Sequence, residues 1–198
     1  MLDKSIPYTG VLMINENPAE YPRFELPAGF LISGYQPGFE FAWADLHMEI
    51  EQFETRAEGV QMYRREFFTH PERQKENCLF VIDEEDQVAA VGALWTGDHF
   101  GRTLPRIHWI AAHPRHQGKG LVKALLTRLM DLHTAADGGP IYLVTQTWSY
   151  KAIHLYKKFG FEPYLGPKPL RWQAEHFEQQ NTEAWALIER KLAEYKRD

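Results

Sequence analysis

Cysteine is nearly absent from this chain, and its single cysteine, Cys78, excludes an intrachain disulfide and any zinc site built from several thiolates. Cys78 leads into an apolar run, so we interpret it as a small core residue. No stretch approaches the roughly 20 apolar residues that cross a membrane. The first residues also lack an apolar segment of signal-peptide length. We therefore expect a cytoplasmic protein with no membrane partner.

Positive charge is also in short supply, because 22 Lys and Arg stand against 27 Asp and Glu, for a net charge of −5. This balance argues against a nucleic-acid partner. The stretch 115–128 reverses the balance, since it holds four basic residues and no carboxylate. A local excess of this kind fits a bound polyanion, although a solvated helix face gives the same pattern.

The spacing of apolar residues predicts a single α/β (α+β) domain with a mixed, largely antiparallel sheet, flanking helices and a C-terminal helix. We expect an N-terminal arm over 1–29, the domain proper over 30–166 and a helical extension over 167–198. Strands are predicted at 11–14, 30–36, 79–83, 87–96, 107–112 and 141–145. Helices are predicted from 39 to a stop at Gly59, over 60–70, from 121 to the glycines at 138–139, over 149–159 with Ser149 as N-cap and Gly160 after the end, and from about 182.

The stretch 106–130 joins a strand to a helix through Gln117-Gly118-Lys119-Gly120. A turn of this kind aims backbone N–H groups and the positive end of a helix dipole at one spot, which makes an anion site. The turn is not a Walker loop, because it lacks the earlier Gly and the Ser or Thr after Lys119. It is not a dinucleotide fingerprint either, since Lys123 stands where the third Gly is needed. A nucleotide hydrolase is therefore disfavoured.

Two segments together resemble the GNAT superfamily of acyl-CoA-dependent N-acyltransferases. The motif A pattern of that family, [QR]-x-x-G-x-[GA], is matched by Gln117 and Gly120, and Val122 departs from it. The motif B pattern, A-x-x-L-Y-x-x-x-G-F, follows about 30 residues later at Ala152, Leu155, Tyr156, Gly160 and Phe161. The predicted order of elements from about 30 to 164 also resembles the family's fold.

The resemblance implies acetyl-CoA as the donor and roles for individual residues. The pyrophosphate would lie on the turn and the start of the following helix, and the pantetheine arm would pair with the end of the preceding strand. Tyr156 stands where the family places a general acid, and Ser149 where a family Asn often touches the cofactor. The cofactor-binding residues implied in this way are Ile110, Ala111, Ala112, Gln117, Gly118, Lys119, Gly120, Leu121, Val122, Lys123, Ser149 and Tyr156.

Transfer of an acetyl group to an amine also needs a base that accepts the amine's proton. Many family members carry a Glu two residues before the pantetheine-binding stretch, and here that position is His108. Histidine, with an ordinary pKa of about 6.5, accepts protons near neutral pH. We therefore expect His108 and Tyr156 to be catalytic, with a mere lining role as the alternative for His108. The predicted protein is an N-acetyltransferase for a primary amine of a small molecule or peptide. An inactive acyl-CoA-binding sensor is the alternative, because His108 and Val122 depart from the family.

The remaining expectations concern metals and partners. The nine histidines include no His-x-x-x-His pair, so we expect no metal site. A stripe near the C-terminus, formed by Trp185, Ile188, Leu192 and Tyr195, needs a surface to bury against. Either its own domain or a second copy in a homodimer would supply that surface.

Overall fold

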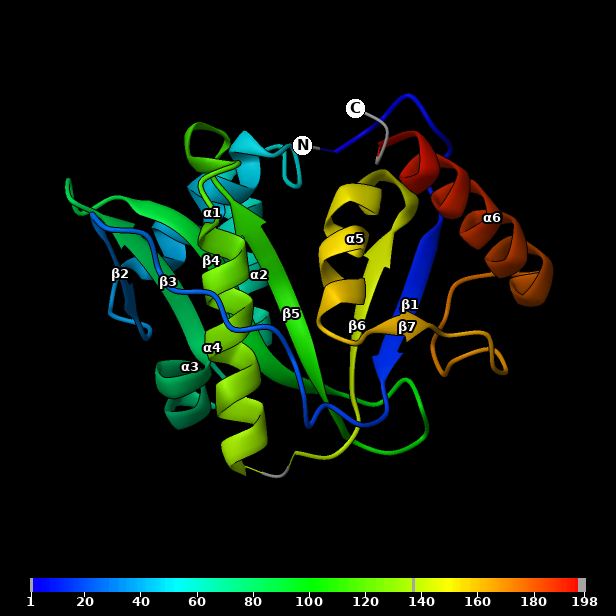
Figure 1. The fold of residues 1–198 in the computed structure, drawn as a ribbon. Helices are drawn as coiled ribbons and strands as arrows, with labels where there is room; N and C mark the ends of the chain where they lie inside the picture. Colours follow the sequence, from blue (N-terminus) through cyan, green and yellow to red (C-terminus); the bar gives the residue numbers. More distant parts are fainter. Residues whose placement is uncertain (1, 137, 196–198) are drawn as a thin grey trace. The chain divides into compact units, whose positions relative to one another are not determined.

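A computed structural model of the protein describes residues 2–136 and 138–195. Its elements, labelled in Figure 1, are β1 (Gly10–Asn15), β2 (Phe30–Ser33), α1 (Phe39–Glu49), α2 (Arg56–Phe67), α3 (Pro71–Asn77), β3 (Cys78–Asp83), β4 (Val88–Gly97), β5 (Leu104–Ala112), α4 (Leu121–Ala136), β6 (Ile141–Gln146), α5 (Tyr150–Lys158), β7 (Glu162–Pro163) and α6 (Phe177–Tyr195), with short 3-10 turns η1 (Pro114–His116) and η2 (Thr147–Ser149).

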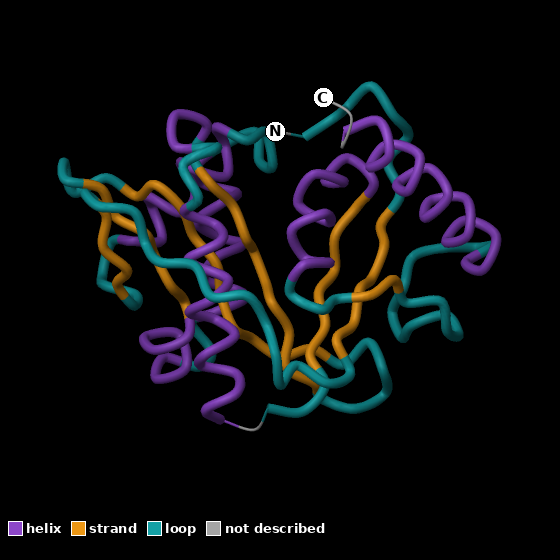
Figure 2. Tube along the Cα trace, viewed as in Figure 1, coloured by secondary structure: helices purple, strands orange, loops and turns teal. Residues whose placement is uncertain are grey.

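The strands form one sheet in the order β2-β3-β4-β5-β6-β1-β7 (Figures 1 and 2). β1 pairs antiparallel with both β6 and β7, β2 with β3, and β3 with β4, whereas β5 pairs with β6 in parallel. The sheet is therefore mixed and largely antiparallel, which confirms the predicted fold class. The chain divides into two compact units. The glycine-turn unit comprises Arg23–Leu94 and His108–His133, and the terminal unit comprises Met1–Pro22, Trp95–Ile107 and Thr134–Asp198.

In the glycine-turn unit, helices cover both faces of β4. A Cβ built on Gly92 would lie 3.2 Å from side-chain atoms of Leu125 and Leu129, so this side of the strand faces α4. Side chains alternate along a strand, so the neighbours of Gly92 point to the other face. Trp43 and Tyr63, from α1 and α2, are fully buried and line one small cavity together with Val91 and Ala93, the neighbours of Gly92. The core of the unit thus lies on both sides of the sheet.

α1 and α2 pack closely at Gly59. A Cβ at this position would lie only 2.7 Å from the Cβ of Ala44, so a side chain would push the two helices apart. The prediction that Gly59 ends the first helix is wrong, because α2 begins at Arg56 and contains Gly59. The true start is a capping box, in which the Thr55 hydroxyl accepts from the Glu58 N–H and the Glu58 carboxylate accepts from the Thr55 N–H.

The terminal unit is built on the strand predicted at 11–14, which is present as β1 between β6 and β7. Asn15 is buried at the end of β1, and its Nδ2 donates to the carbonyl of Phe159 at 3.0 Å, which closes the C-terminus of α5. Gly160 follows with φ of +81°, as predicted for a glycine after the helix end. Ser149, predicted to cap the start of α5, makes no side-chain capping bond, since its hydroxyl accepts instead from Gln146 Nε2 at 3.1 Å.

The stripe on α6 is largely buried within the chain itself. Trp185, Ile188 and Leu192 are 5%, 0% and 3% exposed, whereas Tyr195 is 42% exposed. The helix also begins earlier than predicted, at Phe177 rather than near 182. The three buried residues thus match the alternative in which the stripe packs on its own chain.

The sequence-based prediction missed one helix and misplaced the start of one strand. The helix α3 was not predicted, although Pro71 is a favoured first residue for a helix because its missing N–H would have no partner there. β5 begins at Leu104, three residues before the start of the strand predicted at 107–112. Leu104 is buried with Leu12 and Tyr142 in a core cluster of the terminal unit, so tertiary packing decides where this strand starts.

Candidate active site

The glycine turn presents unused backbone donors. Gly118 and Gly120 have φ of +80° and +86°, a conformation that glycine adopts without strain. No atom lies within 4 Å of a Cβ built on either residue, so the turn is open on that side. The N–H groups of Gly118, Gly120, Leu121 and Val122 donate to no acceptor among residues 2–136 and 138–195. Four free donors at the start of a sixteen-residue helix suit an anion such as a pyrophosphate.

The backbone favours a different register for the motif A pattern. The same pattern, [QR]-x-x-G-x-[GA], also fits two residues earlier, on Arg115, Gly118 and Gly120, with no departure. Both small-residue positions then coincide with the two positive-φ residues before α4. In this register Val122 occupies no small-residue position, and the departure noted at Val122 disappears. Arg115 is the residue that sequence reasoning missed here, and the pattern itself was the signal.

The basic side chains near the turn have neighbours of their own. Lys119 Nζ lies 3.1 Å from His116 Nδ1, and Lys123 Nζ lies 5.4 Å from the centre of the Phe24 ring. Gln117 Nε2 donates to the carbonyl of Ala112 at 3.2 Å. The turn is thus held by side chains to its surroundings, while the backbone N–H groups of Gly118 and Gly120 stay available.

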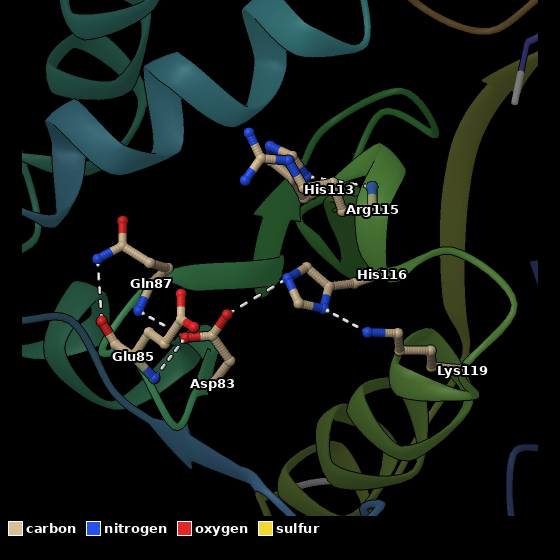
Figure 3. A network of polar contacts seen from close by, with 7 residues as sticks. All are labelled: Asp83, Glu85, Gln87, His113, Arg115, His116 and Lys119. Carbon is tan, nitrogen blue, oxygen red and sulfur yellow. Dashed lines mark hydrogen bonds and ion pairs between the residues drawn. The ribbon is translucent and has the colours of Figure 1, made fainter.

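His116 bridges Lys119 and Asp83, as Figure 3 shows. An ammonium can only donate, so Nδ1 of His116 accepts from Lys119, and the ring proton is on Nε2. Nε2 lies 3.3 Å from the Asp83 carboxylate, which can only accept. Burial lowers the pKa of His116, and the Lys119 ammonium lowers it further. The neutral ring therefore links the turn to the end of β3.

The residues expected to pair with the pantetheine arm end the strand β5. Ile110, Ala111 and Ala112 belong to the glycine-turn unit, whereas the parallel register of β5 with β6 joins Arg106 to Tyr142 and Ile107 to Leu143 in the terminal unit. His113, just after β5, donates its N–H to the carbonyl of Ala89 on β4. This contact anchors the strand end from which the turn departs.

His108 is held by a carboxylate from a distant part of the chain. Its Nε2 lies 3.0 Å from Oε2 of Glu66 on α2, and the two side chains are 18% and 24% exposed. An ionised carboxylate has no proton to give, so Nε2 donates and Nδ1 carries the lone pair. Glu66 was not predicted, because 42 residues separate the pair and only the packing of α2 brings them together.

A second, buried histidine lies in the same unit. His47 is 2% exposed, and its Nδ1 lies 2.8 Å from the carbonyl of Trp43. Burial lowers the pKa of His47 to about 4, so this ring is neutral at pH 7. Its ring centre lies 5.3 Å from that of Trp109, which adopts φ of +51°. A positive φ is strained for a bulky residue, and Trp109 follows His108 directly.

Tyr156 and Ser149 belong to the terminal unit. Tyr156 is 7% exposed, and burial raises the pKa of its phenol well above the ordinary value, so the hydroxyl keeps its proton at neutral pH. No hydrogen-bond partner for this hydroxyl lies within the described ranges. Such a phenol can donate a proton but is a poor base. Cys78, in the other unit, is 3% exposed, as expected for a core residue, and burial raises the pKa of its thiol to about 12.

Neither a cluster of metal ligands nor a membrane-spanning helix occurs within residues 2–136 and 138–195. These residues contain no group of three or more His, Cys, Asp or Glu side chains that could hold a metal ion. They also contain no helix that is long and apolar enough to span a membrane.

A sequence profile of the acetyltransferase (GNAT) family matches residues 39–161. The "L-amino acid N-acyltransferase MnaT" of Escherichia coli is 34% identical over 103 residues, which cover 46% of this chain and 58% of that protein. The "N-alpha-acetyltransferase RimI" of Mycobacterium tuberculosis is 38% identical over 65 residues, which cover 31% and 39%. The chain therefore matches less than two thirds of the length of either relative.

Among solved structures, a GCN5-related N-acetyltransferase from Sphaerobacter thermophilus has a TM-score of 0.57 and 16% identity. The match covers 78% of this chain and 48% of that one. At this level of identity the likeness shows a shared fold.

Proposed function

The chain belongs to the acetyltransferase (GNAT) family, and we propose that it transfers an acetyl group from acetyl-CoA directly to a primary amine of a small molecule or peptide. The observation that carries the proposal is the row of unused N–H donors at Gly118, Gly120, Leu121 and Val122. They form an anion cradle without a metal ligand set beside it, within the described part of the chain. Two relatives whose names specify amino-acid or N-alpha acylation support an amine acceptor.

The cradle suits a pyrophosphate in particular. When bound, acetyl-CoA supplies an activated acetyl carbonyl and a thiolate leaving group. The backbone donors and the dipole of α4 would hold its two phosphates, and the missing Cβ atoms at Gly118 and Gly120 leave room for close approach. Ile110, Ala111 and Ala112 would offer backbone groups to the amide-rich arm.

His108 would act as the general base. The attacking nitrogen loses one proton as the new N–C bond forms, and we assign that proton to Nδ1 of His108, directly or through one water. Glu66 would hold the ring by Nε2 and stabilise the imidazolium that results. The carboxylate therefore acts through His108, as a positioning residue, rather than on the amine itself.

Tyr156 would supply the second proton. The C–S bond breaks as the thiolate departs, and the phenol, protonated because of its burial, would donate to that sulfur. The reaction then balances, with one proton taken by His108 and one given by Tyr156. We expect Tyr156→Phe to lower kcat by about 10²-fold or more, the usual contribution of a general acid.

Three further expectations belong to the same proposal. We place the protein in the cytoplasm, where acetyl-CoA is available. The arm over 1–29, the domain over 30–166 and the extension over 167–198 stay predictions, as does a homodimer. Since three of the four stripe residues on α6 are buried in the chain itself, that stripe gives a homodimer little support.

The test is acetyl-CoA-dependent thiol release measured across amines, amino acids and peptides. We expect turnover with at least one amine class, mass addition of one acetyl group to that amine, and loss of turnover in Tyr156→Phe with acetyl-CoA affinity retained. Acetyl-CoA binding without transfer to any member of the panel would contradict the proposal and favour the sensor alternative.

A further inference from the structure

A pocket in the glycine-turn unit has neither His108 nor Glu66 in its lining. Its volume is about 580 Å³, and its walls come from α1, the turn between β3 and β4, the residues before β2, and the stretch 113–119. Volumes of this order are typical of sites for small molecules. Ala42, Leu46 and Val88 supply an aliphatic part of the lining.

Charged side chains make up much of the lining of this pocket. Five carboxylates and two permanently charged cations line it. Two of the carboxylates are already occupied, because Asp45 contacts Arg56 at 2.6 Å and Asp83 accepts the N–H groups of Glu85 and Gln87.

Three carboxylates and one guanidinium remain without partners. The side chains of Glu49, Glu84 and Glu85 make no ion pair or hydrogen bond with any residue of 2–136 or 138–195, and neither does the guanidinium of Arg115. In Figure 3 the Arg115 side chain stands apart from the line of contacts through Asp83, His116 and Lys119. Unlike Lys119, which is engaged with His116, Arg115 is therefore available to a ligand.

We propose that this pocket binds a small basic amino acid, a molecule with two ammonium or guanidinium groups, one carboxylate and an aliphatic chain. The ligand's carboxylate would pair with Arg115, whose planar fork matches a carboxylate. Its two cationic groups would pair with the unpartnered glutamates, and its methylene groups would lie on the aliphatic lining. A diamine leaves Arg115 unpaired, and an anion meets the excess of carboxylates.

The experiment compares three probes by isothermal titration in the absence of acetyl-CoA, so that its outcome is independent of any transfer activity. L-Lysine carries all three charges, 1,5-diaminopentane lacks the carboxylate, and 6-aminohexanoate lacks the α-ammonium. We expect L-lysine to bind about tenfold more tightly than either analogue, the usual effect of one charged hydrogen-bonded contact.

Variants then assign the contacts. Arg115→Gln keeps a residue that the motif pattern accepts and should reduce L-lysine binding to the level of 1,5-diaminopentane without weakening the diamine. Glu85→Gln should weaken both probes. Arg128→Gln and Glu76→Gln, at exposed positions of the same unit outside the pocket, are matched controls and should change neither.

Two results would overturn the proposal. One is L-lysine binding no more tightly than 1,5-diaminopentane. The other is an unchanged ratio of the two affinities in Arg115→Gln. All four substitutions are at exposed positions, so circular dichroism and the melting temperature should match those of the wild type.

Discussion

Two histidine–carboxylate contacts lie in the same unit, one before and one after the end of β5, and they differ in the charged groups that contact the ring. His116 accepts from Lys119 at Nδ1 and turns Nε2 toward Asp83, so both of its nitrogens are engaged by charged groups. His108 turns Nε2 to Glu66, which fixes the lone pair on Nδ1. We infer that the first arrangement holds the turn in place and that the second prepares His108 to accept a proton.

The partners of a histidine therefore decide its role more than its position near a motif does. Burial of His116 lowers its pKa, and the positive charge of Lys119 lowers it further. The Glu66 carboxylate beside His108 accepts the N–H of Nε2 and so leaves the lone pair of the ring on Nδ1.

Replacement of His108 should have the largest effect. We expect His108→Gln to lower kcat/KM by about 10²- to 10⁴-fold at neutral pH, because general base catalysis contributes this much. His116→Gln is the matched control and should cost less than about tenfold, since that ring only braces the turn. Steady-state kinetics with saturating acetyl-CoA measure both. Equal losses of kcat/KM in the two variants would contradict the different roles assigned to His108 and His116.

Acid should destabilise the fold through His47. The pKa of this ring is about 4 in the folded state against 6.5 ordinarily, so the unfolded chain binds the extra proton first as the pH falls. Stability is therefore lost between about pH 6.5 and 4, by about 3 kcal/mol in total. In His47→Gln the dependence of the unfolding free energy on pH should be flatter over this window. Urea unfolding at several pH values measures it, and an unchanged slope would contradict the assignment.

Removal of the charge on Glu66 should have an intermediate effect. In Glu66→Gln the amide can donate to the ring, which permits the opposite tautomer, and we expect kcat/KM to fall about tenfold. Glu76→Gln, an exposed change of the same kind, should leave kcat/KM unchanged. Nitrogen NMR of labelled histidine reads the tautomer independently of activity. A wild-type His108 with its proton on Nδ1 would count against the role of Glu66.

A substitution in the turn that His116 contacts, Gly120→Ala, should have the smallest effect. Gly120→Ala places a Cβ in open space, so its cost is the backbone strain at φ of +86°, about 1 kcal/mol of unfolding free energy. The same methyl group would obstruct a phosphate on the turn, so the KM for acetyl-CoA should rise while kcat is nearly kept. A KM for acetyl-CoA equal to that of the wild type would argue against a phosphate at this turn.

The sequence predicted the fold class, β1, the β3–β4 hairpin and the helix after the glycine turn, because each has a local pattern of apolar spacing and turn residues. It failed where the deciding contact is distant. Gly59 was predicted to end a helix, but glycine is required at this position because Ala44 of α1 approaches it closely. Glu66 had no local signal, since a charged residue on a helix usually faces solvent. Arg115 matches the motif A pattern, but the prediction placed that pattern two residues later, on Gln117 and Gly120.

The most direct test of the role of His108 is the pH dependence of kcat/KM for the wild type, His108→Gln and His116→Gln, measured at every pH at which circular dichroism shows that the protein is folded. The account predicts that the wild type and His116→Gln share a fall in kcat/KM toward acid pH, as the base becomes protonated, and that His108→Gln has lost this fall. A fall that persists unchanged in His108→Gln would contradict the account, because another group would then be accepting the proton from the amine.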